Sequence, residues 1–208
     1  SAQDGRTQTE TGEGKYHRGK AGHRVTREQA KIFAYFTAVR GVGEQLASLF
    51  KGQAGASKVN SACGNVVVTG ESGNGKTTLA IDIVKALQKL QRVDSSRLAK
   101  ISGKKLNTRD IYETLGKLKG GATIIEKAGG LSDASMMALS LAMEGDTGGL
   151  LIILEDQKAE SDPEREHEEN GISDKVLCLL GLFPAHGKIE VGRAADAFKI
   201  FILNQTTA

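Results

Sequence analysis

The sequence predicts an α/β protein: a three-layer parallel sheet of about five strands with helices on both faces, preceded by a helical N-terminal segment. Short apolar runs, typical of buried strands, alternate with stretches whose apolar residues recur at helical spacing. Such alternation is the pattern of a parallel sheet with crossover helices. We expect strands at residues 65–69, 97–102, 122–126 and 150–154, with 188–191 as a candidate last strand.

A glycine-rich loop joins the first of these strands to the helix that follows. Residues 70–77 read Gly-Glu-Ser-Gly-Asn-Gly-Lys-Thr, a full match to the phosphate-binding pattern G-x-x-x-x-G-K-[ST]. Glycines let several main-chain N–H groups converge on one anion, and the positive end of the helix faces the same place. We therefore predict a site for ATP or ADP, formed by Gly70, Glu71, Ser72, Gly73, Asn74, Gly75, Lys76, Thr77 and Thr78.

Two side chains of this loop have specific expected roles. Lys76 can reach the β- and γ-phosphates, which makes it a candidate catalytic residue. Thr77 offers a hydroxyl ligand to Mg²⁺. Ligands of parallel sheets bind at the carboxyl ends of the strands, where Glu126 and Glu155 also fall, so these acids could converge with Gly70 on one site.

Four segments are expected along the chain. The first is rich in Gly, Thr, Gln, Lys and Arg and has almost nothing apolar, which favours disorder. The second has an apolar helical stripe, and the third contains the alternating strands and helices. The segments are a basic arm over residues 1–24, a helical segment with a linker over 25–62, the main domain over 63–192, and the start of a lid or a C-terminal tail over 193–208.

The helical segment opens with a capping box, in which Thr26 is the cap and Gln29 follows three residues later. Gly41 and Gly43 interrupt the apolar stripe, so we expect two helices or one bent helix. The small and polar residues of 51–62 predict a linker into the first strand.

In the main domain, helix starts and one long loop are predicted from polar residues. We expect Asn107 or Thr108 to cap one helix and Ser132 to cap another. Residues 155–170 are acidic and polar and are predicted to form a solvated loop. A helix is expected over 172–183.

The composition restricts the partners. The net charge of +3 divides unevenly, because residues 1–120 carry 21 basic and 10 acidic side chains, whereas 121–208 carry 7 and 15. Opposite charges could stack copies head to tail in a homo-oligomer, or could bind nucleic acid, but two solvated surfaces are the simpler interpretation and nucleic acid is not expected. No apolar run reaches membrane-spanning length, so no membrane partner is expected. Cys63 and Cys178 match no metal spacing and suit a reducing cytoplasm.

The stretch from about Thr26 to Val191 resembles the large nucleotide-binding subdomain of an AAA+ ATPase, in the CbxX/CfqX, rubisco-activase-like branch. The resemblance rests on residues 65–80, on Ile-Ser-Gly-Lys-Lys-Leu-Asn at 101–107, on Gly-Ala-Thr-Ile-Ile-Glu-Lys at 121–127, and on Gly-Gly-Leu-Leu-Ile-Ile-Leu at 148–154. It implies an ATPase that remodels a protein client. It also implies that the strand ending at Glu126 is the Walker B strand, so Glu126 becomes a catalytic and metal-binding candidate beside Thr77.

Three departures from the family pattern bear on the mechanism. The Walker B strand of the family ends in Asp-Glu, and here Glu126 and Lys127 hold those places. A protonated lysine cannot accept a proton from the attacking water. The family's Ser-Arg-Phe arginine finger keeps only Phe183, and the helical lid is at most begun in 193–208. An arginine finger alone contributes about 10³ to 10⁵ in rate, so little turnover is expected.

Three interpretations remain open on the sequence. The first is an ATPase domain of a protein-remodelling or regulatory factor. The second is a non-hydrolysing module that binds partners or assembles when it holds nucleotide, which Lys127 and the missing finger favour. The third, a loader acting near nucleic acid, rests only on the basic first part.

Overall fold

The chain is described here by a computed structural model that covers residues 25–54, 63–93, 97–145, 148–157, 188–190 and 198–204. The expected basic arm at 1–24 and the expected helix at 172–183 lie outside the described residues, as do residues 55–62 of the expected linker.

The centre of the fold is a six-stranded sheet with the order β2-β3-β4-β1-β6-β5. Four neighbouring strands are parallel, as the sequence predicts. The strand on the other side of β1 is antiparallel to it, and β5 is antiparallel to β6, so the parallel part has four strands rather than about five. The strands are β1 (Cys63–Gly70), β2 (Leu98–Ser102), β3 (Ala122–Glu126), β4 (Leu151–Gln157), β5 (Lys188–Glu190) and β6 (Phe198–Asn204).

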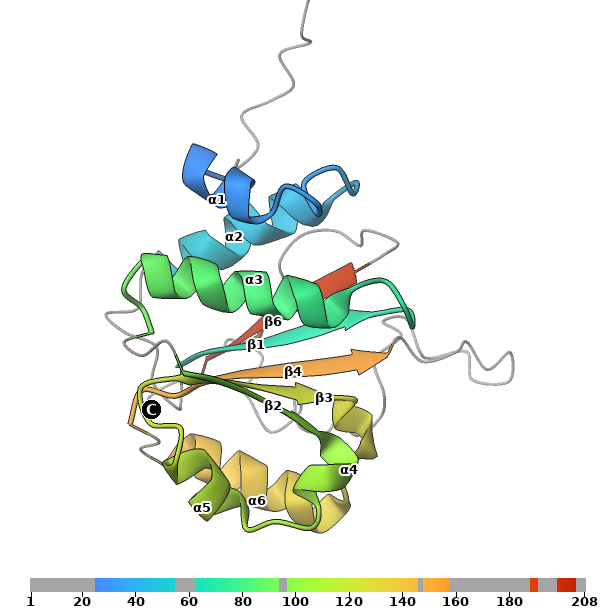
Figure 1. Cartoon of the computed structure of the whole chain (residues 1–208), viewed down its shortest axis with the longest axis vertical. Helices are drawn as coiled ribbons and strands as arrows, with labels where there is room; N and C mark the ends of the chain where they lie inside the picture. The colour runs from blue at the N-terminus through green and yellow to red at the C-terminus, as the bar shows by residue number, and fades with distance from the viewer. Residues whose placement is uncertain are drawn as a thin grey trace, which may run out of the picture.

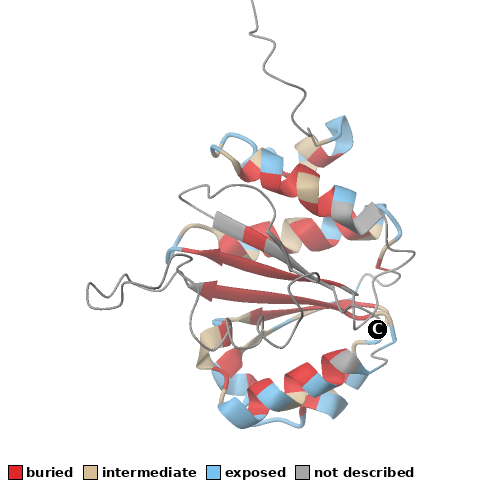
Figure 2. Cartoon of the chain, turned by 180° about the vertical axis from the view of Figure 1, so that it is seen from behind, coloured by how far each residue is buried: buried red, intermediate tan, exposed pale blue. Residues whose placement is uncertain are grey.

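Helices cover both faces of this sheet and form a three-layer α/β arrangement (Figure 1). One face carries α1 (Arg27–Ile32), α2 (Val42–Ala54) and α3 (Lys76–Lys89), and the other carries α5 (Ile111–Gly116) and α6 (Asp133–Glu144). Each face has its own apolar core, because successive side chains of a strand point to opposite faces. Val66 and Val68 of β1 belong to the core beneath α3, whereas Val67 belongs to the core over α6. Figure 2 shows the central strands and the inward sides of the helices as buried.

The N-terminal segment forms two helices joined by a turn. The capping box is confirmed: Gln29 donates its main-chain N–H to Thr26 Oγ1 over 3.2 Å, and the Thr26 N–H donates to the Gln29 side chain over 2.8 Å. The turn is longer than the two glycines predict, since it covers residues 33–41. The predicted linker is wrong at its start, because α2 continues to Ala54.

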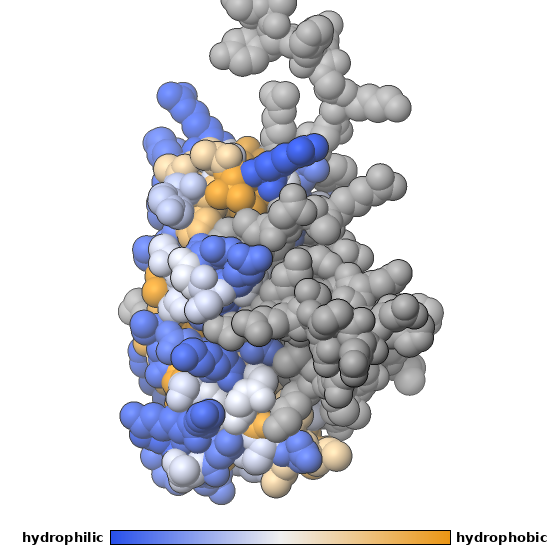
Figure 3. Space-filling view, turned by 90° about the vertical axis from the view of Figure 1, so that its right-hand side faces the viewer, coloured by the Kyte–Doolittle hydropathy of each residue, from blue (hydrophilic) through white to orange (hydrophobic). Residues whose placement is uncertain are grey.

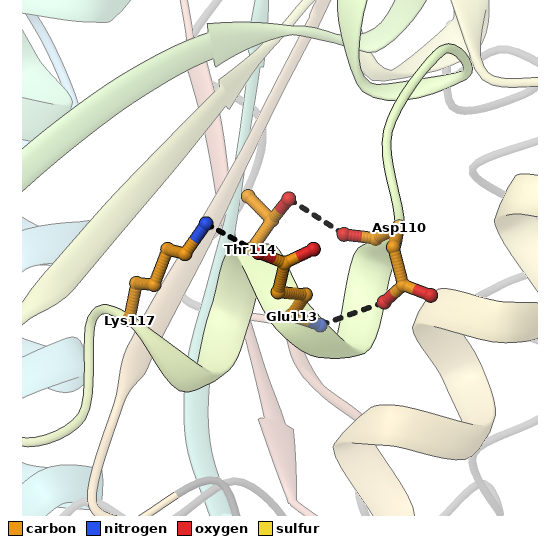
Figure 4. A network of polar contacts seen from close by, with 4 residues as sticks. All are labelled: Asp110, Glu113, Thr114 and Lys117. Atoms are coloured by element: carbon orange, nitrogen blue, oxygen red, sulfur yellow. Dashed lines mark hydrogen bonds and ion pairs between the residues drawn. The ribbon is translucent and has the colours of Figure 1, made fainter.

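A pair of short helices follows β2, and one of their caps differs from the prediction. Asp110 caps α5, accepting a hydrogen bond from the Glu113 N–H over 2.7 Å, with Thr114 and Lys117 completing the polar network in Figure 4. Residues 107–108 belong instead to the turn after α4 (Gly103–Leu106). Ser102 is the N-cap of α4. The Asn107 amide donates to the Gly130 carbonyl and accepts from the Ser132 N–H, and so holds the turn after β3 in place.

The end of β4 also differs from the prediction. The strand was expected to stop at Leu154, with a solvated loop from 155 onward, but it continues through Gln157. Glu155 and Asp156 are therefore strand residues, and both are buried. The rest of that predicted loop lies outside the described residues. The prediction that Ser132 caps a helix is confirmed, since it accepts a hydrogen bond from the Ser135 N–H at the start of α6.

No helix in the described part of the chain combines the length and the apolar character that crossing a bilayer requires.

Candidate functional site

The loop between β1 and α3 is built from residues that allow a left-handed backbone. Gly73 and Gly75 have φ values of 82° and 84°. Only glycine adopts such values at little cost. Gly75 is the N-cap of α3 and carries no side chain that could accept from the first turn. The first main-chain bond into the helix is donated by Leu79 to the Gly75 carbonyl. The N–H groups of the three residues before Leu79 thus lie ahead of the helical hydrogen-bond ladder, at the positive end of the helix.

Lys76 is the buried cation of this loop. Its side chain is only 6% exposed, and its Nζ donates to the main-chain carbonyl of Glu71 over 2.6 Å. Burial lowers the pKa of Lys76 from its usual value, and the carboxylates of Glu155 and Asp156 act in the opposite direction. The ammonium therefore closes the loop on itself and lies in the field of two buried acids.

Thr77 is paired with an acid from a different strand. Its Oγ1 donates to Glu155 Oε2 over 2.5 Å. Thr77 is half-buried and Glu155 is 8% exposed, so this hydrogen bond is partly shielded from water. A short hydrogen bond to an ionised carboxylate is among the stronger polar contacts in proteins.

The sheet register explains how Glu155 reaches the helix. β4 lies directly beside β1, with Val68 opposite Glu155 and Thr69 opposite Asp156. Leu151 and Ile153 point into the core beneath α3, and alternation places Glu155 on the same face. Asp156 follows Ile152 and Leu154, which belong to the other core. The end of β4 therefore places one buried acid on each face of the sheet, and Glu155, on the α3 face, contacts Thr77.

Glu126 and Lys127 lie at the end of β3, one strand farther from β1 than β4 is. Glu126 forms an ion pair with Lys100 at 3.7 Å, and its side chain is 32% exposed. Lys127 is exposed and has a φ of 52°, the left-handed region that side chains rarely adopt. The structure thus pairs Thr77 with Glu155, not with Glu126, and the metal-binding and catalytic roles of Glu126 stay predictions.

An aromatic side chain from the N-terminal segment packs against the loop. A Cβ on Gly75 would lie 3.8 Å from two ring atoms of Phe36, which is buried. The neighbouring Tyr35 is 78% exposed, and its ring meets Phe36 edge to face with centroids 5.2 Å apart. The turn that carries both rings is therefore part of the wall around the start of α3.

The same turn borders a cavity of about 410 Å³. It is lined by Val25, Ala30, Thr37, Ala38, Val39, Arg40, Gly41, Gly43 and Glu44. Small-molecule sites have volumes of roughly 300–1,000 Å³. The cavity is therefore within the size range of small-molecule sites.

The end of the molecule at which the parallel strands terminate faces the viewer in Figure 3. Its described surface is largely hydrophilic, with an apolar area at the level of α1 and α2. In the described ranges no group of three or more His, Cys, Asp or Glu side chains is arranged to hold a metal ion.

The sequence identified the loop but not all of its surroundings. Residues 70–78 form one continuous strand, turn and helix start, as expected. The strand ends predict that Glu155 could converge with Gly70, and the structure brings Glu155 to Thr77. Which acid adjoins the loop, and the contact of Phe36 with Gly75, depend on the strand order and on the docking of the N-terminal segment. A detectable signal was present for Glu155, because it directly follows a strong apolar strand.

Neither a scan against protein-family models nor a search of curated proteins finds a match to this chain. The function must therefore be argued from the site itself.

Proposed function

We propose that this chain binds ATP or ADP with Mg²⁺ at the loop formed by residues 70–78. The observation that carries the proposal is the geometry at the start of α3. Two left-handed glycines, Gly73 and Gly75, precede a helix start that no side chain caps, and the buried ammonium of Lys76 belongs to the same turn. Free amides, a helix N-terminus and a lysine are the combination that binds polyphosphate.

The residues present also suit Mg²⁺. This ion prefers oxygen ligands and is bound through one or two carboxylates together with substrate phosphates, rather than by a cage of protein side chains alone. The hydroxyl of Thr77 and the carboxylate of Glu155 supply such oxygens at the loop. When bound, the ion would neutralise charge on the phosphates.

We further propose that hydrolysis is slow in this chain. The residue after Glu126 is Lys127, an exposed cation at the end of β3. A general base must hold a site for the proton of the attacking water, and a protonated ammonium has none. This favours a nucleotide-dependent switch or assembly module over an active AAA+-type ATPase of a protein-remodelling factor. A protein client and a homo-oligomer are the partners that either function would use.

Calorimetry with Mg-ATP tests the binding proposal. We expect a saturable heat, a rise in melting temperature with Mg-ATP or Mg-ADP, and no comparable effect with adenosine, which lacks phosphates. Ligand that binds only the folded state stabilises it in proportion to the logarithm of its concentration, so the shift should grow with nucleotide. Absence of both heat and shift at millimolar Mg-ATP would refute the proposal.

Phosphate release separates the two functions. We expect purified wild-type protein to release phosphate at close to the background rate, and Lys127→Glu to raise that rate by restoring a carboxylate after Glu126. Lys105→Glu is the matched control, since it makes the same charge change at an exposed position of α4. Rapid turnover by the wild type would exclude the non-hydrolysing module. A gain in Lys105→Glu equal to that in Lys127→Glu would show that the effect is one of overall charge.

A further inference from the structure

The acid that serves the metal site can be identified more closely than the sequence allows. Two candidates lie at the carboxyl end of the sheet, Glu126 on β3 and Glu155 on β4. Neighbouring strands are about 4.8 Å apart, so β4, which adjoins β1, brings its side chains roughly one strand spacing closer to the loop than β3 does.

The contacts of the two acids differ. Glu155 accepts the hydrogen bond of Thr77 over 2.5 Å and is buried. Glu126 has Lys100 as its partner, 3.7 Å away, and a third of its side chain is exposed. Each acid therefore already has one partner, and only the partner of Glu155 belongs to the phosphate-binding loop.

The chemistry of the hydroxyl shows what this contact achieves. A threonine hydroxyl has one proton and two lone pairs. While the proton of Thr77 is donated to Glu155, both lone pairs of Oγ1 point away from that carboxylate and stay available to a cation. The buried negative charge also attracts a divalent ion to the same place, since the interaction is only weakly screened there.

We propose that Glu155, and not Glu126, is the carboxylate that positions Thr77 for Mg²⁺ when the nucleotide binds. The inference rests on the proposed nucleotide site. Glu155 acts here as a positioning residue, through the hydroxyl of Thr77, so its loss should weaken the contribution of the metal to affinity more than the contacts of the phosphates with the loop.

The test compares nucleotide affinity with and without the metal. Wild type, Glu155→Gln and Glu126→Gln are each titrated calorimetrically with ATP in Mg²⁺ and in EDTA, after thermal unfolding has shown that they are folded. The dissociation constant in EDTA divided by that in Mg²⁺ measures the contribution of the metal to affinity, because any general damage to the fold raises both constants. Removing a group that orients a metal ligand costs about 10- to 100-fold in metal affinity. We therefore expect the ratio to fall by about tenfold or more in Glu155→Gln and to be unchanged in Glu126→Gln.

Thr77→Val provides a second route to the same answer. If Glu155 acts through the hydroxyl, the double variant Thr77→Val, Glu155→Gln should lose no more of the metal effect than Thr77→Val alone. The double variant is compared with Thr77→Val only after thermal unfolding has shown that both are folded.

The outcomes distinguish the inference from the function on which it rests. A reduced ratio in Glu126→Gln, with Glu155→Gln like wild type, would overturn the inference and leave the nucleotide site intact. Additive losses in the double variant would also overturn it. Failure of the wild type to bind ATP in either buffer would overturn both.

Discussion

The Nζ of Lys76 lies 2.6 Å from the main-chain carbonyl of Glu71, five residues earlier in the same loop. The lysine that is expected to hold phosphate thus has a contact within its own loop that a phosphate would have to replace. That contact joins the ammonium to an uncharged carbonyl, whereas a phosphate oxygen would bring a negative charge to the same ammonium and so add a Coulomb attraction.

Replacement of Lys76 by Met should abolish nucleotide binding without destabilising the fold. Met keeps the length of the side chain and removes the buried charge. Burial of that charge is the main reason that the pKa of Lys76 is lowered. We expect the melting temperature measured without nucleotide to stay or rise, and the shift produced by Mg-ATP to vanish. Lys85 is an exposed lysine of the same helix and is paired with Asp82. The control variant Lys85→Met should keep the rise in melting temperature that Mg-ATP produces. A large loss of stability in Lys76→Met would show that the lysine is structural.

The same lysine predicts a pH dependence. Because the pKa of Lys76 is lower in the folded than in the unfolded protein, the unfolded state binds more protons between the two values, and stability gains with rising pH there. The free energy of unfolding of wild type should therefore increase relative to Lys76→Met as the pH is raised from neutral toward the unfolded pKa of lysine. Urea denaturation of both proteins over this range measures the difference, in which the other titrating groups cancel. A difference that is flat, or that moves in favour of the variant, would contradict the assignment.

Gly75 should be more sensitive to alanine than a glycine with ordinary backbone angles. Its φ of 84° costs an L-residue about 1–2 kcal/mol, although a Cβ would have room against Phe36. We expect Gly75→Ala to lower the free energy of unfolding by about that amount and to weaken nucleotide binding, because the loop amides would be displaced. Gly43→Ala is the control: it lies in α2 with open space around it, and alanine should stabilise that helix by up to about 1 kcal/mol. Equal effects of the two changes would argue against a strained loop.

Local pattern predicted the segment around the loop better than it predicted the partners of the loop. The strand, the glycines and the helix of residues 63–89 follow from spacing within one short stretch, so sequence alone was sufficient. The sequence predicts a loop from Glu155 onward, because the apolar residues of β4 end at Leu154 and acidic residues follow. Its burial depends on the pairing of β4 with β1, which lie far apart in the sequence.

Helix caps also show that local sequence is not sufficient to predict the structure. Asn107 and Asp110 are both good helix caps, and the choice between them depends on what else they contact. Asn107 is held by the Gly130 carbonyl and the Ser132 N–H from a distant turn, and Asp110 is left to start α5. Propensity names the candidates here, and tertiary contacts decide between them.

The turn that carries Lys127 should depend on a glycine in a different element. A Cβ on Gly103 would lie 2.7 Å from the Lys127 carbonyl oxygen and 3.1 Å from the Leu131 nitrogen, both main-chain atoms that cannot rotate away. Gly103→Ala must therefore push α4 from the turn after β3, and we expect a loss of about 1–3 kcal/mol, as in other overpacked sites.

Gly116→Ala is the matched control for this change, because it lies at the end of α5 with nothing within 4 Å of the added methyl. Its free energy of unfolding should equal that of wild type or exceed it slightly. Urea denaturation measures both variants, and hydrogen exchange at residues 127–131 should rise in Gly103→Ala alone. Since Lys127 already has a φ of 52°, the turn has little freedom to absorb the displacement. If Gly103→Ala were as stable as Gly116→Ala, the turn after β3 would have to be free to move away from α4, and the position of Lys127 relative to the loop could not be fixed by this packing.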